Sequence, residues 1–266
     1  MRLSVDHRTV YRFSTAQNRL VQMLRMTPEN HHDQTVATWR IHIDCDAKMR
    51  PGRDGFGNAI TMLYVEGPVN AIEIEVSGAV LTSHSQGVLN GVAEVLPPAV
   101  FLRETALTPR DPAIRDWAAS VAGEAERATG LRLINEALQR RFAHDLGRPT
   151  GGLDAATAFT RDSGTSRDLA HIFVVAARSL GAPARFVSGY ALIDGEHRPT
   201  PHGWAEAFVD GAGWIGFDPC TGKSPEEDYV RVAAALDAVG AAPVAGSRLG
   251  EGAEELDVDV SVSLTP

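Results

Sequence analysis

The chain has 266 residues, of which 44% are hydrophobic and 22% are charged, as expected for a globular protein with a well-buried core. Its formal net charge is −9 and no stretch is rich in Lys and Arg, which argues against a nucleic-acid partner. No run approaches the ~18 apolar residues of a membrane helix, and residues 1–13 lack the apolar segment of a signal peptide.

Residues 1–82 are predicted to form β-structure. Residues typical of strands alternate with polar residues at Leu3, Val5, Thr9, Tyr11 and Phe13, and again in residues 39–43 and 72–76, which is the period of a half-buried strand. Between these segments, residues 54–58 read DGFGN, a sequence typical of a turn. We therefore expect an N-terminal antiparallel domain that resembles a β-sandwich.

Helical patterns follow a connecting segment over residues 83–111, which is rich in Gly, Ser and Pro. Helices are predicted over residues 112–121, 131–142 and 154–159 from their capping residues and their apolar spacing. The strongest prediction is a helix over residues 166–180, because its apolar face is continuous and a Gly and a Pro follow it directly.

The remaining segments predict strands. Residues 184–192 form one, and residues 203–209 and 214–217 form a β-hairpin around the DGAG turn. Residues 256–264 alternate again and predict a closing strand. We therefore expect an α+β fold in which residues 112–266 form the second domain.

Three polar residues at the ends of these elements suit acyl-transfer chemistry, which needs a nucleophile, a base and a group that orients the base. Ser166 opens the strongest helix, where the partial positive charge of the helix favours a nucleophile and the oxyanion that it generates. His202 begins one hairpin strand and Asp218 ends the other. Hairpin pairing therefore brings the base and the orienting carboxylate to the same end.

Four ordered sequence blocks resemble the bacterial transglutaminase-like family. The chain reads GTSRDLAH at residues 164–171 and LGAPARFVSGY at residues 180–190, similar to G-V-C-R-D-F-A-H and L-G-I-P-A-R-Y-V-S-G-Y. It reads HGWAE at residues 202–206 and GWIGFDP at residues 213–219, similar to H-A-W-A-E and G-W-x-G-F-D-P. The N-terminal segment and the tail around residues 230–246 also resemble bacterial members, so the resemblance covers nearly the whole chain.

The resemblance implies a papain-like core with a Cys-His-Asp triad behind an N-terminal β-domain. Carried over by position, His202 is the general base, Asp218 orients it, and Ser166 stands where the family has its cysteine. The backbone N–H of Ser166 would help to form the oxyanion hole.

The serine is a departure from the family. A hydroxyl is a poor nucleophile in a thiol site, because its pKa lies far above the ~8.5 of a thiol and it cannot form the Cys-His ion pair. Two explanations stay open for Ser166. It is either an engineered replacement that inactivates the enzyme, or a native residue that marks a binding protein or an unusual serine hydrolase.

Candidate substrate-binding residues are Trp204, Asp168 and Tyr190. The two aromatic residues also suit core packing, and Asp168 also suits a carboxylate that complements the helix dipole. His171, one turn further along the helix, is predicted to be a buried, hydrogen-bonded histidine. Cys220 is interpreted as a small buried residue beside the site rather than as a displaced nucleophile.

No metal or cofactor is predicted. The pair His31 and His32 lies in a segment where neighbouring side chains point apart, and no further ligands complete a site. Two cysteines in a chain of this size make no disulfide framework, which suits a cytoplasmic protein.

The leading hypothesis is an enzyme that transfers the acyl group of a peptide, amide or thioester substrate. Water as the acceptor gives a protease or amidase, and an amine gives amide formation. A catalytically silent binding protein on the same fold is the alternative. The sequence leaves the substrate, the acceptor and the oligomeric state open.

Overall fold

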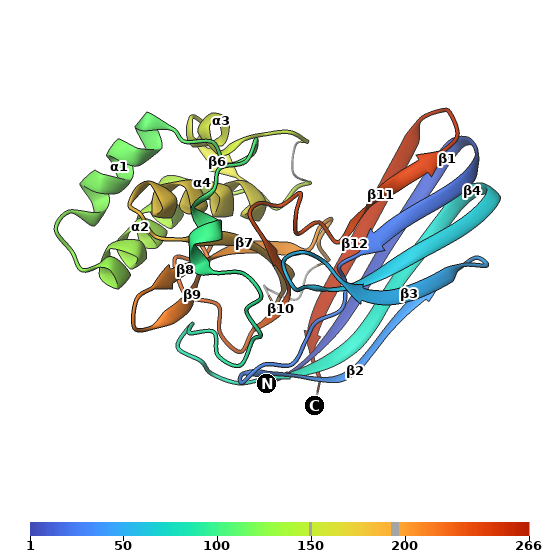
Figure 1. The fold of residues 1–266 in the computed structure, drawn as a ribbon, viewed down its shortest axis with the longest axis horizontal. Helices are drawn as coiled ribbons and strands as arrows, with labels where there is room; N and C mark the ends of the chain where they lie inside the picture. The colour runs from blue at the N-terminus through green and yellow to red at the C-terminus, as the bar shows by residue number, and fades with distance from the viewer. Residues whose placement is uncertain (149–150, 193–196, 266) are drawn as a thin grey trace.

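The computed structural model describes residues 1–148, 151–192 and 197–265. Helices gather around one sheet, and the long strands of a second sheet form a separate layer beside them (Figure 1). The predicted α+β class is therefore confirmed. Within the described ranges, every helix is too short or too polar to cross a lipid bilayer.

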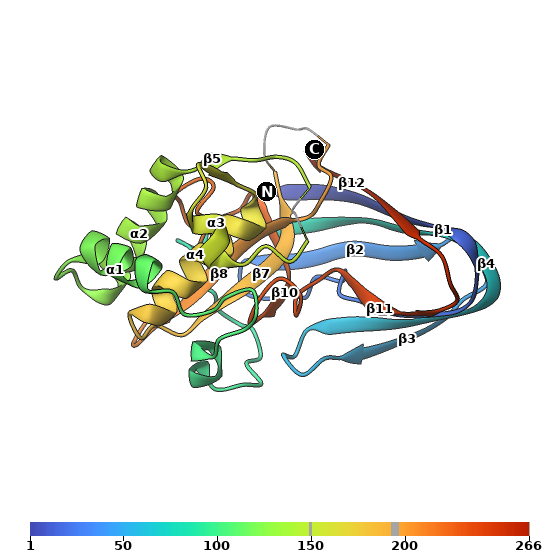
Figure 2. The same cartoon turned by 90° about the horizontal axis from the view of Figure 1, so that it is seen from above.

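The first layer is a six-stranded antiparallel sheet. Its strands are β1 (Arg2–Leu24), β2 (Gln34–Ile43), β3 (Lys48–Arg53), β4 (Ala59–Thr82), β11 (Val244–Leu249) and β12 (Glu254–Leu264). The long pair β1 and β4 forms its centre, with β11 and β12 beside β1, and β2 and β3 beside β4. Figure 2 shows β1 and β4 turning together at the end of the molecule that lies far from the helices.

One hydrophobic cluster joins both halves of this bent sheet. Leu20 and Leu24 come from the second half of β1, and Ile72 and Ile74 come from the part of β4 that pairs with its first half. All four side chains are almost fully buried. The alternation that predicted β-structure in residues 1–82 therefore marks the faces that pack against each other inside the fold.

Residues 244–264 also belong to this sheet. The predicted second domain, residues 112–266, includes this segment, and that boundary is wrong, because β12 pairs with β1 from Leu3 opposite Leu264 to Phe13 opposite Glu254. Alternation predicts that a segment is a strand but does not identify its partner. The open edge of β1 supplies that partner from the other end of the chain.

The second layer is the core domain. Its helices are α1 (Pro112–Ala122), α2 (Arg127–Arg141), α3 (Ala155–Phe159) and α4 (Ser166–Ser179). Its sheet has the antiparallel order β10-β7-β8-β9, formed by β7 (Ala184–Ala191), β8 (His202–Val209), β9 (Gly213–Phe217) and β10 (Tyr229–Ala235). A separate parallel pair joins β5 (Ala143–His144) to β6 (Ser163–Gly164).

The helix boundaries follow the capping signals of the sequence. Asp111 accepts a hydrogen bond from the backbone of Ile114 at the start of α1, and Asp154 caps α3 in the same way. Gly181 follows α4 with a φ of 76°, a conformation that favours glycine. The predicted helices and the predicted hairpin are confirmed, and the strands β5, β6, β10 and β11 have no counterpart among the predicted elements.

The two layers share one hydrophobic interface. Leu3 and Val262 from the first sheet pack with Ala170 of α4 and Val230 of β10. The segment over residues 83–111 also packs closely, because it contains the short 3₁₀ helix η1 (Pro98–Leu102), whose Phe101 is buried against Trp214 with ring centroids 5.2 Å apart. The site described next therefore lies in a continuous structure rather than between two loosely linked domains.

Candidate active site

Helix α4 begins with a reciprocal pair of capping contacts. The Thr165 hydroxyl accepts a hydrogen bond from the Asp168 backbone N–H. In return, the Asp168 carboxylate accepts a hydrogen bond from the Thr165 backbone N–H at 3.1 Å. The Thr165 hydroxyl also donates to the same carboxylate at 2.7 Å. This arrangement fixes the first turn of α4, and it holds Ser166 as the first residue of a buried helix.

The hairpin of β8 and β9 brings the predicted base and orienting carboxylate together. His202 begins β8, and Asp218 directly follows β9. His202 Nε2 lies 2.8 Å from Asp218 Oδ2, with 9% of the His202 side chain and 0% of the Asp218 side chain exposed. The pair is therefore almost completely shielded from solvent.

Asp218 is held in its charged form. Burial alone would raise the pKa of its carboxyl group, but the neighbouring His202 ring and two further hydrogen bonds lower that pKa below its ordinary value. Tyr229 Oη donates to Oδ2 at 2.6 Å, and the backbone N–H of Cys220 donates to Oδ1 at 2.9 Å. The charged carboxylate can therefore orient His202 and stabilise its protonated form.

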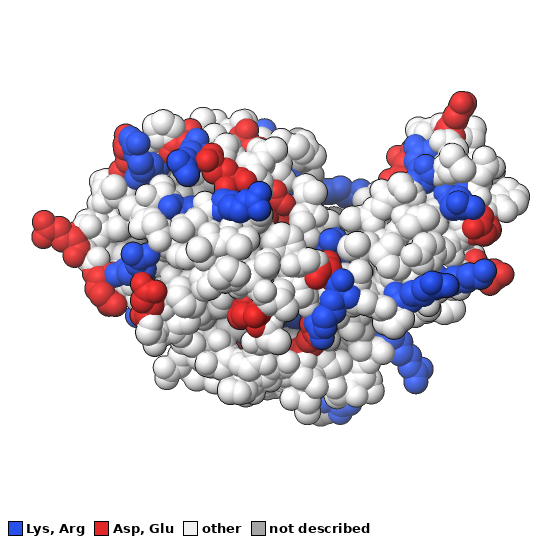
Figure 3. Space-filling view, in the orientation of Figure 1, with Lys and Arg blue, Asp and Glu red and all other residues white. Residues whose placement is uncertain are grey.

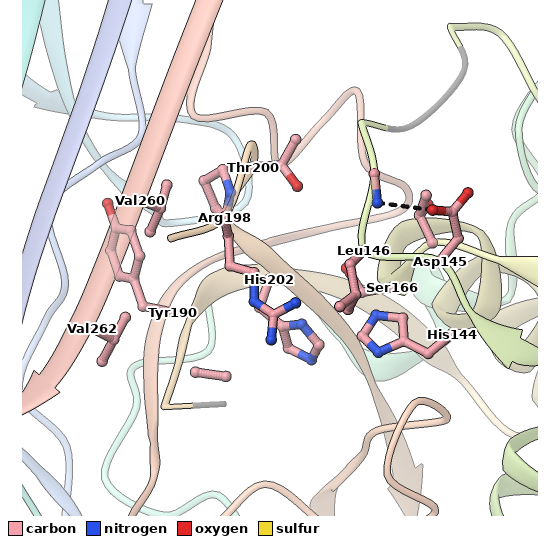
Figure 4. Close-up of a pocket in the computed structure, with 14 residues that line it drawn as sticks. His144, Asp145, Leu146, Ser166, Tyr190, Arg198, Thr200, His202, Val260 and Val262 are labelled. Carbon is pink, nitrogen blue, oxygen red and sulfur yellow. Dashed lines mark hydrogen bonds between the residues drawn. The ribbon is translucent and has the colours of Figure 1, made fainter. Parts of the chain in front are cut away.

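Ser166 and His202 line the same cavity (Figure 4). Its Oγ accepts a hydrogen bond from the Gly203 N–H at 3.2 Å. A Cβ atom at Gly203 would lie 2.6 Å from the Phe186 ring. Glycine at position 203 therefore leaves room for the Phe186 ring of β7 beside the start of β8.

The three candidate substrate-binding residues lie in different surroundings. Tyr190 lines the cavity above Ser166 and its hydroxyl lies 3.0 Å from His7 Nδ1. Trp204 is stacked near His202, with ring centroids 6.3 Å apart, and lines a separate cavity. The Asp168 carboxylate is engaged in the hydrogen bonds that cap α4. Of the three, only Tyr190 is among the described residues that line the cavities beside Ser166.

His171 and Cys220 have the structural surroundings expected for them. The backbone N–H of Ala238 donates to His171 Nε2 at 3.0 Å, and burial lowers the pKa of this histidine to about 4. Cys220 is half-buried beside Asp218, where burial and the negative charge raise the pKa of its thiol well above its ordinary value. A thiol that stays protonated is a weak nucleophile.

The potential ligand atoms of His202, Asp218 and Cys220 lie within 4.8 Å of one another. The carboxylate already receives three hydrogen bonds, from His202, Tyr229 and the Cys220 backbone. A metal ion needs a deprotonated thiol, which this surrounding disfavours. The arrangement therefore fits a hydrogen-bonded triad better than a metal site.

Two residues of the site have no signal in the sequence blocks. Tyr229 lies beyond the last block and reaches Asp218 because β10 pairs with β7. His144 lies before the first block, on the short strand β5, and its ring centroid is 6.3 Å from that of His202. Both positions depend on strand pairing over a distance, which local patterns do not encode.

Each of the two domains contains a segment that matches a known protein family. Residues 3–81 match the bacterial transglutaminase-like N-terminal region, and residues 115–219 match the transglutaminase-like superfamily. Uncharacterized proteins of Mycobacterium leprae and Mycobacterium tuberculosis are each 25% identical to this chain. The first match covers 98% of both proteins, and the second covers 100% of this chain and 93% of its relative.

A solved structure has the same fold. A candidate cysteine protease from Cytophaga hutchinsonii superimposes with a TM-score of 0.76 at 18% identity, and the match covers 100% of this chain and 92% of that one. The two family matches occur in the order of the two layers, and all four sequence blocks fall within the second match. Residues 115–219 therefore belong to the transglutaminase-like superfamily, and residues 3–81 match the bacterial transglutaminase-like N-terminal region.

Proposed function

We propose that this protein is an acyl-transfer enzyme of the papain-like type, in which residue 166 supplies the nucleophile, His202 is the base and Asp218 orients the base. The observation that carries the proposal is the 2.8 Å contact between His202 Nε2 and Asp218 Oδ2, because His202 also lines a cavity together with the side chain at the N-terminus of α4. This combination of groups serves nucleophilic catalysis in unrelated folds.

The reaction would begin with attack of the Ser166 side chain on the carbonyl carbon of an amide or thioester. The proton of the nucleophile passes to the Nδ1 of His202, since Nε2 faces Asp218. The backbone N–H of Ser166 and the N-terminus of α4 stabilise the negative oxygen. The leaving group departs with the proton from His202, and the acyl group stays on residue 166.

An acceptor then releases the acyl group. Water gives hydrolysis, as in a protease or amidase, and an amine gives a new amide bond. We propose peptides, amides or thioesters as substrates, with an amine as the second possible acceptor. The two cysteines are both unpaired, which supports a cytoplasmic location.

Labelling experiments test this function. A fluorophosphonate probe is applied to the unmodified chain, and iodoacetamide is applied to the Ser166→Cys variant. We expect the cysteine variant to react rapidly at residue 166, and His202→Ala in that background to abolish the rapid reaction. Adducts are assigned by peptide mass, because Cys45 and Cys220 remain in every form. Labelling that is independent of His202, or absent in both forms, would contradict the proposed triad.

A catalytically silent binding protein is the second candidate. It is favoured by the hydrogen bond to Ser166 Oγ, which comes from the Gly203 N–H rather than from the His202 ring. Among the described residues, no hydrogen bond joins this hydroxyl to the His202 ring, which is the contact that activation by the base requires. This candidate predicts that the unmodified chain does not react with the fluorophosphonate, although the Ser166→Cys variant reacts with iodoacetamide.

A further inference from the structure

A second cavity reaches Ser166 from the interface between the two layers. Its volume is about 520 Å³, within the size range of small-molecule sites. Ser166 and His202 line one side, and Tyr11 and Val258 of the first sheet line the other. Figure 3 shows the surface hollowed between the helical lobe and the long sheet. The N-terminal domain thus forms a wall of the space in front of the nucleophile.

This cavity offers mainly apolar surface. Two of the polar side chains on the wall formed by β1 are hydrogen-bonded, because His7 Nδ1 lies 3.0 Å from the Tyr190 hydroxyl and His7 Nε2 lies 3.0 Å from Thr9 Oγ1. Burial lowers the pKa of His7 to about 4, so this ring is neutral at pH 7. Among the described lining residues, Arg167 carries the only formal charge, and it contacts Asp168 at 3.3 Å.

We propose that this cavity binds the hydrophobic chain of the acyl group that is transferred to residue 166. The inference rests on the proposed function for the position of the reacting carbonyl. An apolar chain gains free energy by leaving water, whereas a charged chain would lose its hydration without a partner on this wall. The substrates are therefore acyl compounds with a hydrophobic chain next to the carbonyl carbon.

Two p-nitrophenyl esters of different chain length test the proposal. In both, attack by residue 166 forms a new acyl bond, and p-nitrophenol leaves with the proton from His202. We expect the second-order rate of acylation to be about tenfold or more higher for the octanoate than for the acetate, since each buried methylene contributes roughly a factor of four. The unmodified chain and the Ser166→Cys variant are both measured.

Filling the cavity with a larger side chain should remove the preference for the octanoate ester over the acetate ester. Val258→Trp, on β12, and Ala242→Phe, in the loop before β11, each narrow the cavity from a different element. We expect either variant to lower the rate of acylation by the octanoate ester and to change the rate of acylation by the acetate ester much less. Asp257→Trp is the matched control, because Asp257 is exposed on the same strand as Val258. Thermal unfolding verifies that each variant is folded.

Equilibrium binding separates this proposal from the catalytic one. Octanamide should bind the unmodified chain about tenfold or more tightly than acetamide by calorimetry, and Val258→Trp should abolish the difference. Equal reaction of the two esters together with equal binding of the two amides would overturn the proposal. Chain-length-dependent binding without any ester reaction would retain the acyl cavity and overturn the acyl-transfer function.

His144 is an independent observation on the other side of Ser166. Its strand β5 pairs in parallel with β6, so that His144 lies opposite Gly164, two residues before Ser166. Both side chains line the same cavity, and Figure 4 shows the Ser166 side chain between His144 and His202. The His144 ring meets the His202 ring edge-on at an interplanar angle of 71°.

The His144 ring is available as a hydrogen-bond donor. Burial and the proximity of His202 lower the pKa of His144 below its ordinary value, so the ring is neutral and keeps one N–H. Within the described part of the chain, no residue forms a hydrogen bond with this ring. A half-buried donor beside a nucleophile can stabilise the charge that develops on the attacked carbonyl oxygen.

We infer that His144 donates a hydrogen bond to the oxyanion, together with the backbone N–H of Ser166. This role also rests on the proposed function. His144 keeps its own proton throughout, while the proton of the nucleophile passes to His202. The carbonyl oxygen becomes negative as residue 166 attacks, His144 donates a hydrogen bond to it, and the double bond re-forms when the leaving group departs.

Acylation and alkylation distinguish this role from that of a base. Acylation by p-nitrophenyl acetate passes through an oxyanion, whereas alkylation of a thiol by iodoacetamide does not. In the Ser166→Cys background, we expect His144→Phe to slow acylation by about 10²- to 10³-fold and to leave alkylation of residue 166 unchanged. His144→Gln, which keeps a donor, should recover part of the lost acylation rate.

His202→Ala is the control, and it should slow both reactions because the thiolate is lost. A parallel loss of acylation and alkylation in His144→Phe would overturn the oxyanion role, and so would unchanged acylation. If His202→Ala left the rates of both acylation and alkylation unchanged, that result would instead contradict the proposed triad.

Discussion

Glu206 lies at the centre of a buried ion-pair network in the core sheet. Arg185 Nε lies 2.6 Å from its Oε2, and Arg231 Nε lies 2.7 Å from its Oε1. Burial alone would raise the pKa of Glu206, but the two guanidinium groups lower it to about 2. The Arg185 guanidinium also lies over the Trp214 ring, 3.8 Å from its centroid. This network therefore fixes the sheet that carries His202.

We predict that Glu206→Gln destabilises the protein by about 3 kcal/mol at pH 7, because Arg185 and Arg231 lose the charge that compensates their burial. The pKa of Glu206 falls from its ordinary 4.5 to about 2 on folding, so the unfolded chain binds the proton first as the pH falls. The stabilisation is therefore complete above pH 4.5 and is lost as the pH falls toward 2.

Urea unfolding at a series of pH values measures both effects. The stability of the variant should depend less on pH than that of the unmodified chain in this acidic range. Glu73→Gln is the matched control, since Glu73 pairs with Arg8 at an exposed site where ion pairs contribute little. Equal losses in the two variants would show that the buried network has no special contribution.

The capping contacts of α4 link an element to the chemistry of its first residue. Thr165→Ala removes the hydroxyl that pairs with Asp168, and we predict a loss of about 1 kcal/mol in the free energy of unfolding. Because the first turn then frays, reaction at residue 166 should also slow. Urea unfolding and probe labelling of the Ser166→Cys background measure the two effects.

Asp111→Ala is the control for this element. Asp111 caps α1 through the Ile114 backbone N–H at 2.8 Å, so its loss should cost a similar free energy. It should not alter labelling at residue 166, because that residue lies on α4 and not on α1. If both variants slowed labelling equally, the effect of Thr165→Ala on the labelling rate would result from general destabilisation and not from a change in the position of Ser166.

At the scale of the whole molecule, the C-terminal strand connects the two layers. Val262 on β12 lies opposite Val5 and packs in the cluster that joins the first sheet to the core domain. We predict that Val262→Asp costs about 3 kcal/mol or more, because an unpaired charge enters an apolar interface. Ser263→Asp, at an exposed neighbouring position, should leave stability nearly unchanged. Thermal and urea unfolding compare the two, and similar losses would contradict the interface role of β12.

Local sequence determined most of the core domain. The caps of α1 and α3, the glycine after α4 and the turn of the hairpin all act between residues close in the chain, and each was predicted correctly. The proximity of His202 and Asp218 follows from the same hairpin. The resemblance added the proposed role of Ser166, which stands where the family has its cysteine. Local patterns alone could not distinguish this serine from an ordinary helix cap.

Tertiary structure decided the rest. The partner of β12, the contact between Tyr229 and Asp218, and the position of His144 all depend on pairing between segments that are distant in sequence or very short. The cavity between the layers depends on how two apolar faces meet. Alternation and helical period specify which face of an element is buried, but they do not specify the surface against which it is buried.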